Sequence, residues 1–80
     1  MTPEEITRTK ITMACLASVA PDEIEVDIGE SHVFKIPYRT LGMWFVYSPD
    51  AEMPSSDFLE WHIWDCMARV DEMEDKKKRK

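Results

Sequence analysis

Glycine and cysteine are scarce in this sequence, and each shortage excludes a class of function. With two glycines in 80 residues, the chain has no glycine-rich loop that could cradle a phosphate. Its two cysteines, Cys15 and Cys66, form no CxxC pair, so neither a zinc framework nor a disulfide scaffold is indicated. Both lie in apolar stretches, where we expect them to act as small buried hydrophobic residues in a reduced, cytoplasmic protein.

Long apolar runs are missing too. No segment approaches the roughly 20 apolar residues that a membrane-spanning helix needs. The short chain also excludes multi-domain enzymes and nucleotide-binding α/β sheets, and a single small domain is expected over residues 1–75. An apolar fraction of 44% is typical of a folded domain.

Patterns for catalysis and metal binding are absent as well. No Ser or Cys lies in a recognisable nucleophile motif. His62 and Cys66 are one helical turn apart, but two ligands do not complete a metal site. Glu60, His62 and Asp65 point in different directions around a helix and do not converge. We therefore expect no enzymatic activity, no cofactor and no metal.

Basic residues are concentrated at one end of an acidic chain. The sequence has 16 acidic and 10 basic residues, and five of the bases are residues 76–80, so residues 1–75 carry a net charge of −11. Such a body repels phosphate, and direct nucleic-acid binding by the folded part is not expected. The negative charge either keeps the protein soluble or attracts a protein with a basic surface. Residues 76–80 are predicted to be a disordered tail.

Local patterns in the first half of the chain predict one helix and two strands. Residues Thr2–Glu5 have the capping box of a helix start, and Pro21 ends this helix. Residues 23–28 alternate acidic and β-branched side chains, as in a half-buried strand. Residues 32–36 are predicted to form a second strand that runs back alongside it. A three-residue turn, Gly29–Ser31, keeps the apolar side chains of both strands on one face. The pairs predicted by this register are Ile28 with His32, Val26 with Phe34, and Glu25 with Lys35.

The second half predicts a third strand and a long helix. Residues 41–47 are apolar without clean alternation, which favours a strand buried on both faces over a short helix within 39–47. Ser55 or Ser56 then caps a helix running to about Asp75. Its predicted core positions are Leu59, Ile63, Cys66, Val70 and Met73.

These elements predict an α+β fold in the order α-β-β-β-α, a three-stranded antiparallel meander packed by N- and C-terminal helices. The double-stranded-RNA-binding domain is similar in element order. This sequence lacks the basic residues of that family, so the shared order implies no function.

The last helix has an unusual second apolar face. Trp61, Trp64 and Ala68 lie about 140–200° around the helix from Leu59, opposite the predicted core positions. Rigid aromatic side chains of this kind are typical of binding hot spots. We predict a partner-binding surface formed by Trp61, Trp64, Ala68, Phe58 and Asp65. The alternative is that a tryptophan packs inside the chain, under the 48–54 loop or against the first helix.

Acidic side chains form a second candidate surface. Glu23, Glu25 and Asp27 are expected on one side of a strand, about 6.6–6.8 Å apart, which is of the same order as the phosphate spacing along a nucleic-acid strand. Such a row would suit a basic groove, or it would simply be the solvent face of an edge strand. The last helix is expected to add further negative surface through Asp57, Glu60, Asp65, Asp71, Glu72, Glu74 and Asp75.

Together these features favour a small acidic interaction module that anchors its tryptophans in a protein partner and occludes a basic, nucleic-acid-handling surface. In size, charge and style the chain resembles viral or phage-encoded inhibitors of host factors, anti-CRISPR proteins among them, which implies a cytoplasmic inhibitor. The alternative function is a homo-oligomeric structural or assembly protein with Trp61 and Trp64 at its self-interface. A homodimer is expected, which would be loose, or replaced by a monomer, if the chain is a module for a foreign partner.

Overall fold

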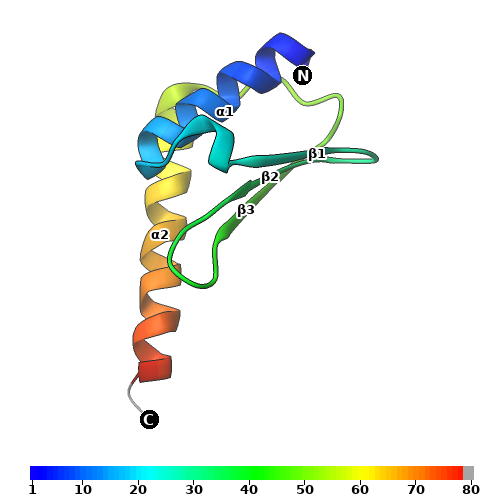
Figure 1. Cartoon of the computed structure of the whole chain (residues 1–80). Coiled ribbons are helices and arrows are strands. Elements are labelled where there is room, and N and C mark those ends of the chain that lie inside the picture. The colour runs from blue at the N-terminus through cyan, green and yellow to red at the C-terminus, as the bar shows by residue number, and fades with distance from the viewer. Residues whose placement is uncertain (79–80) are drawn as a thin grey trace.

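The computed structural model describes residues 1–78 and confirms the predicted element order. Helix α1 spans Pro3–Ala17 and a short 3-10 turn, η1, spans Pro21–Glu23. The strands are β1 (Glu25–Ile28), β2 (His32–Ile36) and β3 (Met43–Tyr47), and helix α2 spans Ser56–Lys78. Both helices lie against the same side of the sheet, and α2 continues well past it (Figure 1).

The start of α1 is the predicted capping box. The Thr2 hydroxyl accepts a hydrogen bond from the Glu5 backbone N–H at 3.2 Å, and the Glu5 carboxylate accepts one from the Thr2 N–H at 2.8 Å. The bond from the Thr2 backbone lowers the pKa of Glu5. The helix ends at Ala17 because Ser18 adopts a left-handed conformation with φ 59°.

The sheet has the predicted topology and register. Its strand order is β1-β2-β3, with both pairs antiparallel. The first hairpin closes through the predicted three-residue turn, Gly29–Ser31. The structure contains all three predicted pairs, Glu25–Lys35, Val26–Phe34 and Ile28–His32. The prediction of an odd-numbered turn that keeps the apolar side chains on one face is therefore confirmed.

The helices cover only one face of the sheet. Phe34 and Ile36 of β2 and Met43 and Phe45 of β3 are buried against apolar side chains of α1 and α2. The residues that alternate with them along the strands face outward. We call this outward side the open sheet face, formed by Glu25, Asp27, Val33, Lys35, Trp44 and Val46.

Two expectations about the sheet were wrong. The third strand is buried on one face only, and Trp44 and Val46 are 68% and 62% exposed. The reason is that nothing within residues 1–78 covers the far side of the sheet. Gly42 precedes this strand with φ +71°, a conformation that suits glycine. Ile28 was expected in the core but is exposed, because it ends the edge strand β1, whereas its cross-strand partner His32 on the central strand is buried.

Helix α2 is longer than predicted and its inner face differs near the end. The Ser55 hydroxyl accepts a hydrogen bond from the Phe58 N–H at 3.2 Å, which confirms the predicted cap. Leu59, Ile63 and Val70 are buried as expected and Cys66 is half-buried. The helix runs to Lys78 rather than ending near Asp75. The end of the predicted basic tail, residues 79–80, lies outside the described residues.

Near that end Met73 is exposed, and Glu74 takes the inner position. Glu74 belongs to a group of polar side chains that joins the β2–β3 loop to α2, which we call the Arg39 cluster: Tyr38, Arg39, Thr40, Asp71 and Glu74. Arg39 forms ion pairs with Asp71 at 2.8 Å and with Glu74 at 2.7 Å. The Glu74 carboxylate also accepts hydrogen bonds from the Thr40 backbone and hydroxyl. Glu74 was expected on the negative surface, and the loop instead draws it inside.

The Arg39 cluster makes stability sensitive to acid. Hydrogen bonds from Arg39 and then Tyr38 lower the pKa of Asp71 below its usual value of 3.8. A carboxyl whose pKa is depressed on folding adds stability above its unfolded pKa, and that stability is lost as the pH falls through the folded pKa. Thermal unfolding followed by circular dichroism from about pH 7 to about pH 2 tests this. The wild type should lose melting temperature more steeply below about pH 4 than Asp71→Asn. Parallel curves would contradict the assignment.

Candidate protein-interaction surface

The outward side of α2 carries two exposed tryptophans. Trp61 is 78% exposed and Trp64 is 57% exposed. Residues three apart are neighbours on a helix surface, so the two indoles form one patch, and exposed Ala68 lies one turn beyond Trp64. We call this patch, with Phe58 and Asp65, the α2 outer face. The alternative that the 48–54 loop or α1 buries one of the tryptophans is wrong.

Phe58 occupies one flank of the α2 outer face. Its ring is 54% exposed, and its centroid lies 5.5 Å from that of His62. The His62 ring in turn meets Phe45 of β3 edge-on at 4.8 Å. Phe58 therefore lies on the side of α2 that faces β3, and Trp61 lies between it and Trp64 around the helix.

Acids surround the tryptophans on α2. Asp57 and Glu60 flank them in the first turns and have no ion-pair partner among the described residues. Asp65 pairs with Arg69 at 3.1 Å and Glu72 pairs with Lys76 at 3.5 Å, all on the exposed surface. Pairs of this kind contribute little to stability and leave their carboxylates accessible. The α2 outer face is thus an aromatic patch within a negative rim.

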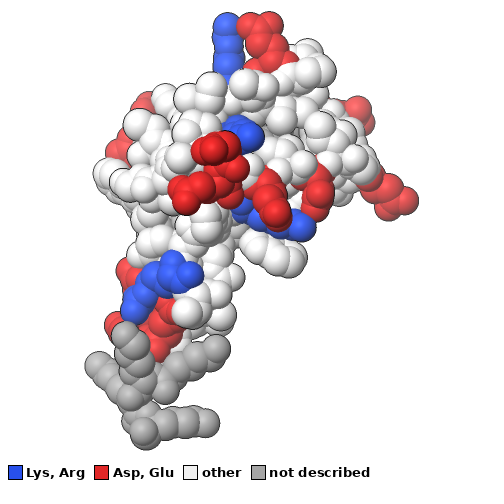
Figure 2. Space-filling model, in the orientation of Figure 1, with Lys and Arg blue, Asp and Glu red and all other residues white. Residues whose placement is uncertain are grey.

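The acid row is shorter than the sequence predicted. Glu23 belongs to the turn η1, where its carboxylate accepts a hydrogen bond from the Ala20 N–H at 2.8 Å. Asp27 forms an ion pair with Lys35 at 2.8 Å, which raises the pKa of Lys35. Glu25 lies directly across the strands from the same lysine. Acids do gather over η1 and β1 in Figure 2, but a lysine of β2 already neutralises part of their charge.

The open sheet face holds an aromatic residue that sequence reasoning missed as a surface residue. Trp44 lies opposite Lys35 in the strand register, and the Lys35 ammonium sits 5.4 Å from the indole centroid. Val46 lies in the next row, opposite Val33. The signal was present in the sequence, because a strand that pairs with β2 must place the partner of the charged residue Lys35 on the same side as Lys35.

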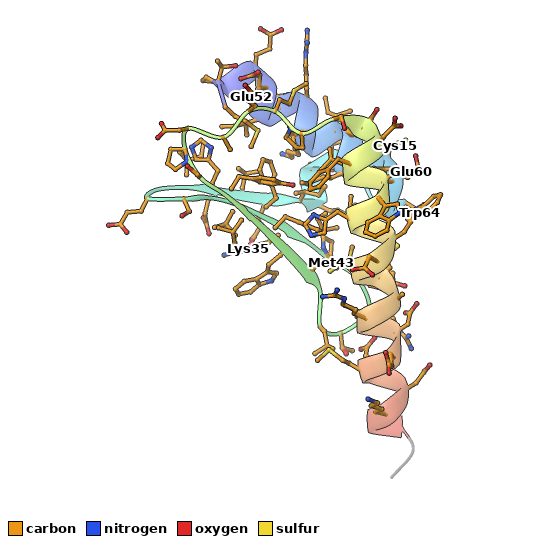
Figure 3. All side chains as sticks on the ribbon, turned by 180° about the vertical axis from the view of Figure 1, so that it is seen from behind. Cys15, Lys35, Met43, Glu52, Glu60 and Trp64 are labelled. Carbon is orange, nitrogen blue, oxygen red and sulfur yellow. The ribbon has the colours of Figure 1, made fainter. Side chains whose placement is uncertain are left out.

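The predicted site residues therefore fall on two separate surfaces. Trp61, Trp64, Ala68, Phe58 and Asp65 lie on α2, whereas Glu25 and Asp27 lie on the open sheet face. The helix layer separates the two surfaces, since the inner side of α2 faces the sheet. Figure 3 shows Lys35 and Trp64 well apart. One partner surface of ordinary size would contact one set or the other.

The cysteines and histidines offer no second site. Cys15 is exposed on α1, contrary to expectation, because it lies opposite the buried face of that helix. Cys66 is half-buried, and burial raises the pKa of its thiol, which keeps it protonated at neutral pH. Within residues 1–78, no three His, Cys, Asp or Glu side chains are placed to hold a metal ion.

No protein family matches the chain, and neither a curated protein nor a solved structure shows significant similarity to it. In the described part of the chain, neither helix has the length and apolar character that crossing a bilayer requires.

Proposed function

We propose that this chain is a non-enzymatic, cytoplasmic interaction module that binds a basic protein through the α2 outer face. The observation that carries the proposal is the exposure of Trp61 and Trp64 within a rim of acids. Exposed tryptophans are costly to leave in water and are typical anchors of protein interfaces. In this mechanism the indoles enter an apolar pocket of the partner.

The carboxylates around the tryptophans specify the partner's chemistry. Asp57 and Glu60 have no ion-pair partner among the described residues, so they are available to Lys or Arg side chains at the rim of the pocket. A basic surface of that kind is often one that handles nucleic acid, and the module would inhibit by occluding it. Self-association through the same face is less favourable, because two copies would bring acids against acids.

The test uses three tagged baits in a clarified cell lysate: the wild type, a Trp61→Ala/Trp64→Ala double variant and Trp44→Ala. Proteins retained by the wild type are identified by mass spectrometry, purified and titrated by calorimetry. We expect a partner rich in surface Lys and Arg whose affinity for the double variant falls by at least about 100-fold, since each hot-spot truncation costs about 2 kcal/mol or more.

Trp44→Ala is the matched control, because it removes an exposed indole from the open sheet face. The affinity of a single α2 outer face for the partner should match that of the wild type. Binding should also weaken as salt rises, since the proposed rim contacts are ionic. Equal binding by the double variant, or no specific protein retained by the wild type, would contradict the proposed function.

A further inference from the structure

Strand β3 has a free edge. It is the last strand in the order β1-β2-β3, so the backbone N–H and C=O groups of alternate residues point away from β2. None of the hydrogen bonds found among residues 1–78 outside the β2–β3 ladder uses these outward groups. An edge of this kind can pair with another extended chain.

The two edges of the sheet differ in their protection. Strand β1 is only four residues long and carries Glu25 and Asp27, and charged side chains on a short strand discourage pairing. Strand β3 reads Met-Trp-Phe-Val-Tyr and contains no charge and no proline. It therefore lacks the usual devices that block the addition of a further strand.

The side chains of β3 are complementary to those of a second copy. If two β3 strands pair antiparallel about a two-fold axis at Phe45, Trp44 of each copy lies opposite Val46 of the other on the open sheet face. Both residues are more than 60% exposed in the single chain, so this pairing would cover apolar surface twice. Cross-strand pairs of an aromatic and a β-branched residue are favourable in sheets.

The uncharged edge of β3 is where a second copy would meet the least repulsion. The chain has a net charge of −6, so two copies repel each other at most of their surface. Contact between two α2 outer faces would place acids opposite acids. Contact between two β3 strands would place no charged side chains of Met43–Tyr47 opposite each other, because that strand has none. We propose that the chain forms a homodimer by antiparallel β3–β3 pairing, which gives a continuous six-stranded sheet. This inference does not depend on the proposed function.

The dimer would be reversible and would present two binding faces. Five residues a side bury less than the roughly 800 Å² per partner of a standard interface, so the dimer should dissociate on dilution. Because the pairing uses β3, it leaves Trp61 and Trp64 of both copies exposed. A partner with two basic sites would then be bound bivalently.

The pairing is tested by light scattering after size exclusion, over concentrations up to about 1 mM, on variants that carry opposite charges at the β3 edge. The edge variants are Trp44→Lys/Val46→Lys and Trp44→Glu/Val46→Glu. Each alone sets like charges directly opposite one another and should have the mass of one chain. An equal mixture sets Lys opposite Glu and should recover the mass of two chains. Circular dichroism checks that each variant is folded.

The matched control is Trp61→Glu/Trp64→Glu, which makes the same change of charge on α2 and should leave the dimer intact. The proposal is overturned if the wild type has the mass of one chain throughout, or if both edge variants still dimerise. It is also overturned if the mixture stays monomeric, or if only the α2 variant loses the dimer.

Discussion

Phe34→Ala is expected to remove most of the stability of this protein. Phe34 has no exposed surface and lies on the central strand, between Val26 of β1 and Phe45 of β3. Its ring meets Tyr47 edge-on at 5.7 Å. Truncating a buried phenylalanine typically costs about 3–5 kcal/mol, through lost burial and the cavity that remains.

That loss is large compared with the total free energy of unfolding of the protein. At about 0.05–0.15 kcal/mol per residue, a chain of this length has a free energy of unfolding of roughly 4–12 kcal/mol. Urea denaturation followed by circular dichroism should place Phe34→Ala at a much lower midpoint or find it unfolded at room temperature. Trp61→Ala is the control, because that indole is 78% exposed and its loss should cost less than about 1 kcal/mol. Similar midpoints for the two variants would contradict the assigned core.

Glu74→Ala should produce the second large effect. The residue is 6% exposed, and its carboxylate accepts two hydrogen bonds from Thr40 and an ion pair from Arg39. Removing it leaves the Thr40 backbone N–H without its acceptor, and of the carboxylates of Asp71 and Glu74, Arg39 keeps only its ion pair with Asp71. We expect a cost of about 2–3 kcal/mol, below the range for fully buried ion pairs because Arg39 is partly exposed.

Glu72→Ala provides the comparison on the same helical turn. Its carboxylate is 70% exposed and, among the described residues, pairs only with Lys76, so its loss should change the free energy of unfolding by less than about 0.5 kcal/mol. Amide hydrogen exchange would locate the effect of Glu74→Ala, since faster exchange is expected in the last turns of α2 and in the β2–β3 loop. Equal costs for the two glutamates would show that the Arg39 cluster does not hold α2 to the sheet.

Local sequence patterns were sufficient to predict much of the architecture. The capping box at Thr2, the alternation over β1 and the parity of the Gly29–Ser31 turn determine element type and register within a few residues of chain. The two faces of α2 could also be predicted, because the angle between Leu59 and Trp61 depends only on helix geometry. What the α2 outer face binds stays a prediction.

Which surfaces are covered was decided by tertiary structure. Trp44 and Val46 are as apolar as Met43 and Phe45, so composition alone could not show that one pair faces solvent. The described residues form two α-helices, and both pack on one side of the sheet, which leaves the other side open. The burial of Glu74 likewise depends on Arg39, 35 positions earlier in the sequence. By itself the sequence determined helices, strands and their pairing, because these depend on near neighbours, whereas the open sheet face and the Arg39 cluster depend on how distant segments pack.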